Sequence, residues 1–335
     1  MAVLLVALIA GCAKLRELAA PPAPGVTSEW ALLLNEIRVF ERRIGFADTG
    51  NFANLSREQQ AFPFCGHAPR LVLPYSYEDP AIKWLAVESE EECRALGSDV
   101  DVYFGESEAL GEVATPLTPA MVEGKLDRFL YLVIHEDCHD QFAFPYGIEE
   151  ALCDLITLKA MVEFAEEKYW AYASETRAVR RYAESQSGIA YATITYYERL
   201  AALYARFGRN EIPPDVLLRE RESIFRSARV PLGRTQGEMN NVRIANHMTY
   251  SRHFPFLETV YVALGRDLTR TVAFFRRVDK LKPSRASVMK QNRIATEESV
   301  AFLRAYEAAM VETIRKALAD EGRDIKPGRA ILSHL

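Results

Sequence analysis

Two histidines four residues apart, His135 and His139, are the residues of this sequence best suited to chemistry. On a helix, residues at i and i+4 lie one above the other, so both imidazoles can reach one zinc ion. Glu136 lies about 100° further round such a helix. From there it can accept a proton from a water molecule instead of binding the metal. The segment therefore predicts zinc-assisted hydrolysis with Glu136 as the catalytic base.

A catalytic zinc ion needs a third protein ligand, because it is bound by three side chains and a water molecule. Glu149 and Glu150 both follow at the start of the next predicted helix, and either could supply it. Only Glu150 has an acid four residues later, Asp154. This E-x-x-x-D pattern resembles that of thermolysin-like zincins, the gluzincins. The resemblance implies that Glu150 binds zinc and that Asp154 orients an imidazole.

The elements that must position these residues begin with a mixed N-terminal part. Apolar residues at helical spacing predict an amphipathic helix over 29–44. Residues 62–80 are rich in proline, glycine and aromatic residues, which predicts an irregular segment with one short strand at 71–73. A helix is expected over 82–96, and alternating apolar residues predict a strand over 99–104.

From residue 121 almost to the end, the apolar positions follow a helical period. A helix over 121–140 carries the histidines, and a helix over 148–170 carries the acids. Further helices are expected over 192–207, 214–228, 242–252, 256–264, 268–280 and 297–320. The sequence therefore predicts a single domain over 28–335 of the α+β class, predominantly helical. In it a small sheet precedes the active-site helix and the C-terminal half is helical.

The composition restricts the classes of partner. Hydrophobic residues make up 49% of the chain and charged residues 26%, as in soluble globular proteins. The net charge of −5 argues against nucleic acid or an anionic membrane surface as a partner. The sequence has no zinc-finger cysteine spacing, phosphate-binding glycine loop or dinucleotide fingerprint.

The first residues predict export and lipid anchoring. Residues 2–10 form an apolar run that is too short to span a bilayer and typical of a signal-peptide core. The run ends in I-A-G-C at Cys12, which resembles the lipobox of bacterial lipoproteins. We predict a signal peptide over 1–12 and a proline-rich tether over 13–27. The protein would then face the periplasm from the outer membrane of a bacterial envelope, bound only through its lipid. An apolar first helix that packs on the domain is the alternative.

Four cysteines follow: Cys65, Cys93, Cys138 and Cys153. An even number permits disulfides in an oxidising compartment, and four cysteines allow three pairings. Cys138 and Cys153 both belong to the predicted metal segments and could be neighbours. Buried thiols are equally consistent with the sequence.

Several segments, in the same order, resemble the predicted zinc aminopeptidases of bacterial envelopes. They are F-P-F-C-G at 62–66, L-P-Y at 73–75, D-V-Y at 101–103 and A-L-G at 109–111, followed by N-N-V-R-I at 240–244 with Tyr250 and P-F at 255–256. The resemblance spans residues 60–280. It implies a zincin-like metallopeptidase that hydrolyses peptide or protein substrates. Asp137 and Cys138 stand where the family has small apolar residues.

The same resemblance suggests residues that complete the site. Leu110 and Gly111 match a loop that could serve as a substrate-binding edge strand, and Asn240 and Asn241 match a polar signature. Asn241 could instead be a helix N-cap.

On a helix from residue 242, His247 and Tyr250 share one face. A tyrosine hydroxyl or a protonated histidine that faces zinc could stabilise the oxyanion of a tetrahedral intermediate. The alternative is a core tyrosine and a surface histidine.

Two functions without hydrolysis also fit the sequence. A zinc-binding lipoprotein without turnover is suggested by Asp137 and Cys138, since a cysteine could close the fourth metal position. A helical scaffold with a chance motif is the third interpretation.

Overall fold

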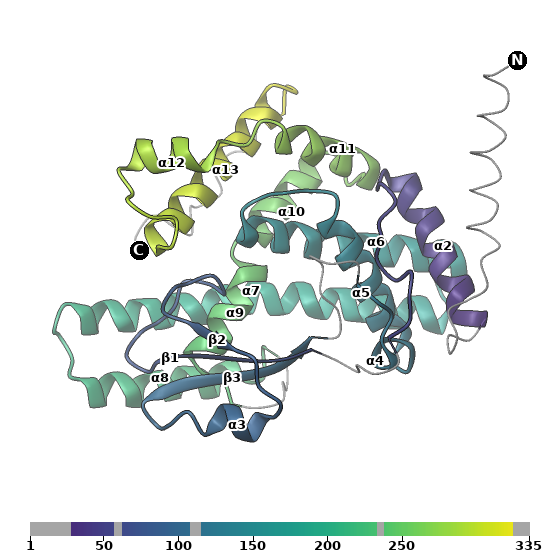
Figure 1. The fold of residues 1–335 in the computed structure, drawn as a ribbon. Coiled ribbons are helices and arrows are strands. Elements are labelled where there is room, and N and C mark those ends of the chain that lie inside the picture. The colour runs from purple at the N-terminus through teal and green to yellow at the C-terminus, as the bar shows by residue number, and fades with distance from the viewer. Residues whose placement is uncertain (1–27, 57–61, 108–114, 233–237, 324–335) are drawn as a thin grey trace, which may run out of the picture.

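The computed structural model describes residues 28–56, 62–107, 115–232 and 238–323. The predicted signal peptide, the lipidation site Cys12, the tether over 13–27, Leu110 and Gly111 lie outside the described residues. The predicted class is confirmed in its coarse form, because the described chain is mostly helical with one small antiparallel sheet (Figure 1).

The sheet has three strands in the order β2-β1-β3, with both pairs antiparallel. They are β1 (Phe62–Pro69), β2 (Lys83–Leu85) and β3 (Val100–Ser107). The predicted strand over 99–104 is confirmed as β3.

The prediction of an irregular segment over 62–80 was wrong for its first part, which forms the central strand β1. Aromatic rings pack across the glycines of the neighbouring strands. A Cβ at Gly66 would lie 2.6 Å from the Trp84 ring, and one at Gly105 would lie 2.4 Å from the Phe64 ring. The glycines therefore make room for cross-strand aromatic packing, which stabilises the strand.

The segments around β1 also differ from expectation. Residues 71–73 form no strand, and the helix expected over 82–96 is replaced by β2 and the short helix α3 (Glu90–Arg94). A disulfide between Cys65 and Cys93 joins α3 to β1. This cross-link and the pairing of β2 with β1 depend on residues distant in the sequence, so local helical spacing did not predict them.

The remaining elements are helices. They are α2 (Ser28–Ile44), α4 (Pro119–Val122), α5 (Leu126–His139), α6 (Tyr146–Tyr169), α7 (Ser174–Gly208), α8 (Pro214–Ala228), α9 (Asn241–Ser251), α10 (Phe254–Ala263), α11 (Leu268–Asp279), α12 (Arg285–Asn292) and α13 (Val300–Ala319). The helix expected over 121–140 is interrupted around Gly124, α7 begins earlier than predicted, and α12 was not predicted.

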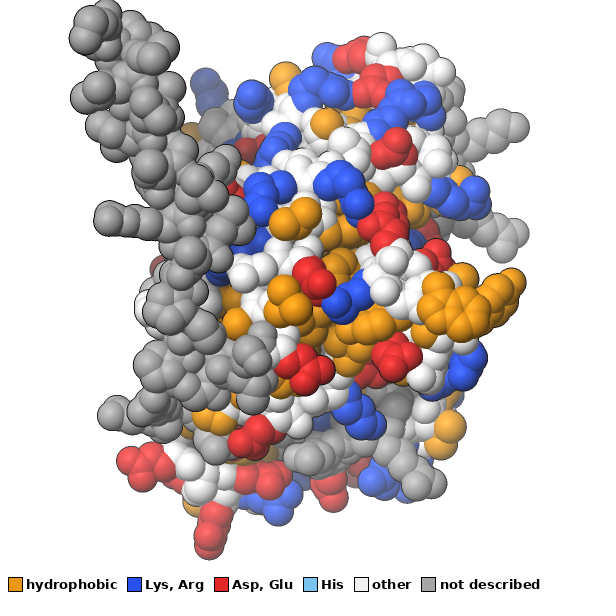
Figure 2. All heavy atoms as spheres, turned by 90° about the vertical axis from the view of Figure 1, so that its right-hand side faces the viewer, with side chains coloured by type: hydrophobic (Ala, Val, Ile, Leu, Met, Phe, Trp, Pro, Cys, Tyr) orange, Lys and Arg blue, Asp and Glu red, His pale blue; other side chains and the backbone are white. Residues whose placement is uncertain are grey.

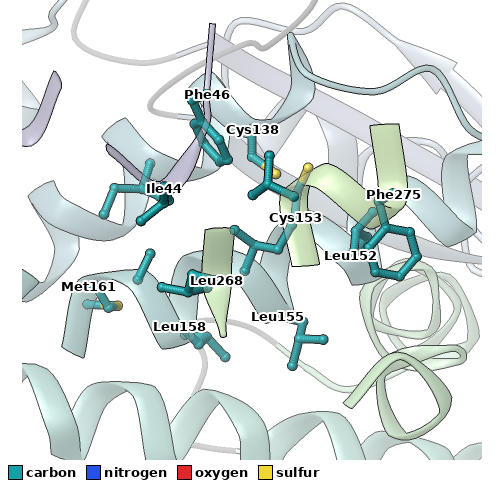
Figure 3. Close-up of a cluster of buried hydrophobic side chains, with 14 of the residues drawn as sticks. Ile44, Phe46, Cys138, Leu152, Cys153, Leu155, Leu158, Met161, Leu268 and Phe275 are labelled. Atoms are coloured by element: carbon teal, nitrogen blue, oxygen red, sulfur yellow. The ribbon is translucent and has the colours of Figure 1, made fainter. Parts of the chain in front are cut away.

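The helices that bear the predicted ligands, α5 and α6, lie side by side in the largest apolar cluster. Figure 3 shows α6 side chains such as Leu152 and Leu155 packed with Ile44, Phe46 and Phe275 from other segments. In Figure 1 the sheet lies to one side, and α9 contacts both the sheet and α6. Side chains on α5 and α6 are therefore held by packing on their apolar faces.

A buried ion pair joins the sheet to the helices. The Arg221 guanidinium on α8 is 1% exposed and donates two hydrogen bonds, of 2.7 and 2.9 Å, to the Asp101 carboxylate on β3. The backbone N–H of Asn241 donates to the same carboxylate at 3.2 Å. Asp101 therefore holds the start of α9 and the middle of α8 against the sheet.

Within the described residues, no helix has both the length and the apolar character needed to cross a membrane. On the face shown in Figure 2, basic and acidic side chains are interspersed with smaller hydrophobic areas. The described side chains on this face form no extended area of one charge.

Candidate metal centre

His135, His139 and Glu150 converge into a group that could hold a metal ion. The two Nε2 atoms lie 3.2 Å apart, and Glu150 Oε2 lies 3.3 Å from that of His135 and 3.4 Å from that of His139. Two donors bonded to one zinc ion at about 2.0–2.1 Å in tetrahedral geometry are about 3.3 Å apart. The three separations therefore fit one tetrahedrally bound ion.

The donor set also fits a metal ion chemically. Glu150 is 3% exposed, and its Oε2 is buried without a hydrogen-bond partner among the described residues. An unpaired buried carboxylate oxygen is costly, and a bound cation would remove that cost. The described residues bring three donors together here, and two imidazoles with one carboxylate are a set that catalytic zinc uses.

The outer nitrogen of His135 faces an acid, as the E-x-x-x-D resemblance implied. His135 Nδ1 lies 3.4 Å from Asp154 Oδ1, and that oxygen accepts a hydrogen bond from the Tyr131 hydroxyl. The Tyr131 ring also stacks on His135, with centroids 5.1 Å apart. Tyr131 is one helical turn before His135, so its position was readable from the sequence although it was not singled out.

The outer nitrogen of His139 is bound by Glu149. His139 Nδ1 lies 3.1 Å from Glu149 Oε1, and the other oxygen of that carboxylate accepts the Phe144 backbone N–H at 2.8 Å. Consecutive residues on α6 thus serve different purposes. Glu150 faces the donors and Glu149 orients one of them, so the two acids that competed for the third ligand position both belong to the site.

Removing either outer acid is expected to weaken zinc binding by about 10–100-fold, because an acid beside the outer ring nitrogen fixes the ring orientation and raises ligand basicity. The variants are Glu149→Gln and Asp154→Asn, and the measurement is competition for zinc with a chromophoric chelator. Glu166→Gln, an exposed residue of the same helix that pairs with Arg180, is the control. Equal affinity in all four proteins would contradict the roles assigned to Glu149 and Asp154.

Before a metal binds, neighbouring charges keep the Glu150 carboxyl group ionised and the His139 imidazole protonated. Burial alone would raise the pKa of Glu150, but the two imidazoles beside its carboxylate hold it well below its usual range. Burial alone would lower the pKa of His139, but the hydrogen bond with Glu149 and the nearby Glu150 carboxylate raise it to about 12. Metal binding near neutral pH must therefore displace a proton from His139.

Zinc affinity is accordingly expected to rise with pH. Because the pKa of His139 is raised to about 12, its imidazole remains protonated through neutral pH in the metal-free protein. Displacing one proton changes the affinity by about tenfold per pH unit. Chelator competition between about pH 6 and about pH 8, with calorimetry in buffers of different ionisation enthalpy, measures this. An affinity independent of pH, with no proton release, would contradict it.

Glu136, the predicted base, is buried in the same helix. Burial raises its pKa, and the two histidine ligands partly counteract that effect. A carboxylate whose pKa is raised toward neutrality accepts a proton more readily than an ordinary surface glutamate. The environment therefore suits proton transfer.

The two residues between the ligand histidines are directed elsewhere. The Asp137 carboxylate accepts hydrogen bonds from the Thr49 hydroxyl and from Asn51 Nδ2. Cys138 is a buried free thiol in the core, where its sulfur and that of Cys153 point toward each other (Figure 3). Neither residue belongs to the donor group. The sequence left a neighbouring pair and buried thiols equally open, and the structure has two buried free thiols whose sulfurs lie next to each other on the core side of the helix.

Tyr250 lies beside the cluster, with its ring centroid 6.4 Å from that of His135. Burial, followed by the negative charges of Glu150, Asp154 and Glu136, raises its pKa well above the usual value. The hydroxyl is therefore protonated at neutral pH and can donate a hydrogen bond.

A second tyrosine, Tyr146, was missed in the sequence. It is the first residue of α6, and burial, followed by the nearby Tyr250 and Glu150, raises the pKa of its hydroxyl. Its ring lies 5.6 Å from that of Tyr77, in the loop after β1. The sequence shows Tyr146 four residues before Glu150, but its position beside Tyr77 depends on contact between segments that are distant in the chain.

His247 differs from expectation. Burial, followed by the charge of Arg243, lowers its pKa to about 4, and Nε2 has no hydrogen-bond partner among the described residues. The imidazole is therefore neutral at physiological pH and does not provide the protonated donor that was expected.

The two asparagines are engaged within the fold. Asn240, not Asn241, is the N-cap of α9, and its Oδ1 accepts the Arg243 backbone N–H at 3.0 Å. Asn240 Nδ2 donates to the Val102 carbonyl at 2.6 Å, and Asn241 Nδ2 donates to the Val72 carbonyl at 2.7 Å. Their amides bind backbone, which accounts for both residues without a substrate.

Comparison of the chain with protein family models, with curated proteins and with solved structures finds no match in any of the three. Function is therefore inferred from the chemistry of the residues themselves.

Proposed function

We propose that this chain is a zinc-dependent peptidase of zincin type, with aminopeptidase-like activity, at the envelope of a bacterium. The observation that carries the proposal is the spacing of His135, His139 and Glu150, with Glu136 next to the first ligand on the same helix. Three protein donors are the number that a catalytic zinc ion uses, whereas a structural ion usually has four.

The residues divide the work of hydrolysis as follows. A bound zinc ion supplies Lewis-acid polarisation of a carbonyl group and activation of water. Glu136 takes the proton from the attacking water and delivers it to the leaving amine. The neutral Tyr250 hydroxyl donates a hydrogen bond to the negative charge that develops on the carbonyl oxygen. Asp154 and Glu149 keep the imidazoles in orientation.

The alternative of a zinc-binding protein without turnover receives less support. It was suggested by Asp137 and Cys138, because a cysteine ligand would close the fourth position. Asp137 is hydrogen-bonded to Thr49 and Asn51, and Cys138 packs in the core. The position that a substrate would need is therefore not taken by either residue.

The disulfide between Cys65 and Cys93 supports the proposed location. Disulfides persist in oxidising compartments such as the periplasm and are rare in the cytosol. Attachment through a lipid on Cys12 is part of the same proposal, and mass spectrometry of the envelope fraction tests it.

The proposed function is tested on protein purified without chelator. We expect about one zinc ion per chain by elemental analysis and hydrolysis of members of a fluorogenic peptide library. Removal of zinc with a chelator should abolish hydrolysis, and added zinc should restore it. Peptides with free and with acetylated N-termini separate an aminopeptidase from an endopeptidase. Metal-free protein, or hydrolysis that is insensitive to the chelator, would contradict the proposal.

A further inference from the structure

A buried acid on the last described helix lies against the segment that bears the third ligand. Glu307 on α13 is 3% exposed. Its Oε2 accepts a hydrogen bond from the Tyr75 hydroxyl at 2.7 Å and lies 2.8 Å from His253 Nε2. One carboxylate oxygen thus joins α13, the loop after β1 and the residue before α10.

The other oxygen of Glu307 lies against the first turn of α6. A Cβ built at Gly147 would lie 2.6 Å from Glu307 Oε1. Only a residue without a side chain leaves this space for the carboxylate. Gly147 comes two residues before Glu149 and three before Glu150, so the contact is made in the turn that carries both site acids.

The first turn of α6 has no side-chain cap of its own. Its N-cap residue is Pro145, which makes no capping hydrogen bond. The first N–H groups of a helix have no partner within the helix, and negative charge is favourable beside them. Glu149 places one negative charge in this turn, and the Glu307 carboxylate adds a second from a distant part of the chain.

Glu307 carries this charge despite its burial. Burial would raise its pKa, but the charge and hydrogen bond of His253 and the charge of Arg252 lower it below the usual value. The Arg252 guanidinium lies 3.7 Å from the centroid of the Tyr75 ring and donates to the Tyr75 carbonyl. The anion is therefore enclosed by groups that favour it.

We propose that Glu307 is a positioning residue for the metal centre, holding the first turn of α6 so that Glu150 faces both imidazoles and Glu149 bonds His139. This role of Glu307 rests on one part of the proposed function, which is that the site binds a metal ion. It acts through the backbone at Gly147, and Glu307 itself touches neither metal nor substrate.

The test compares Glu307→Gln and Gly147→Ala with wild-type protein loaded with zinc or cobalt(II). Each change weakens or displaces the charge at the helix start, so we expect zinc affinity to fall by roughly tenfold or more in both, as for other groups that orient ligands. The cobalt(II) absorption spectrum, which reports ligand geometry, should shift. The double variant should bind zinc little worse than either single variant, because both changes break one contact.

Leu217→Ala is the matched control, because Leu217 is fully buried in the separate apolar cluster of α7, α8 and α9. It should destabilise the fold but leave zinc affinity and the cobalt spectrum unchanged at temperatures where it is folded. If Glu307→Gln and Gly147→Ala behave like Leu217→Ala, the proposal is overturned. If the wild-type protein itself binds no zinc, the proposed function is overturned, and this role with it.

Discussion

The Glu136→Gln variant is expected to keep its zinc and to lose peptide hydrolysis by a factor of about 10²–10⁴. Glutamine has nearly the shape of glutamate but cannot accept a proton from water at neutral pH. The ligands His135, His139 and Glu150 are untouched, so metal content should remain that of the wild type. The measurement is kcat/KM on the best library peptide together with zinc content by elemental analysis.

A matched control for this variant lies on the same helix. Asp127→Asn removes an acid from the first turn of α5, two helical turns before His135, and should hydrolyse peptides almost as well as wild type. Wild-type activity in Glu136→Gln would rule out Glu136 as the base. Loss of zinc together with activity would show that Glu136 acts on the metal site instead of on the proton.

Replacing Arg221 with Met is expected to lower the free energy of unfolding by about 3–5 kcal/mol. The substitution leaves the Asp101 carboxylate buried beside the sheet without its two guanidinium hydrogen bonds. The backbone N–H of Asn241 and the partly exposed Arg70 guanidinium, whose Nε lies 3.7 Å from Asp101 Oδ1, would then be its remaining partners. Urea denaturation followed by circular dichroism measures the change.

Two further variants show whether the loss of stability in Arg221→Met comes from the burial of the ion pair. Arg206→Met removes the guanidinium of an exposed pair with Glu220 and should cost less than about 1 kcal/mol. Adding Asp101→Leu to Arg221→Met should recover part of the lost stability, because no unpaired charge then remains buried. A loss below about 1 kcal/mol in Arg221→Met would show that Asp101 is not held by this pair.

The positions of His135 and His139 on one helix face were predictable, because they follow from the spacing of the two residues along a helix. His135 and His139 are one helical turn apart, and the periodicity of α5 was clear from its apolar residues. The same reasoning placed Glu150 and Asp154 on one face of α6. The helix that contains both acids was predicted to within two residues of its observed start.

Other parts of the site and fold were not predictable from local patterns. β1 looked irregular because its glycine and its two prolines are poor strand formers, yet cross-strand aromatic rings fill the space above Gly66 in β1 and Gly105 in β3. The role of Glu149 depends on where the loop after His139 places Phe144 and the start of α6. Asn240 and Asn241 donate side-chain hydrogen bonds to backbone carbonyls, and these carbonyls belong to β3 and to the segment after β1.

The sequence by itself determined the metal-binding residue types, their helical spacing and the predominance of helices, because these follow from short-range periodicity. Only the tertiary structure decided which of two adjacent glutamates faces the Nε2 atoms of both histidines, which cysteines pair, and which acid packs against the first turn of α6. Those outcomes depend on contacts between segments distant in the chain, such as Glu307 against Gly147, and no local pattern encodes them.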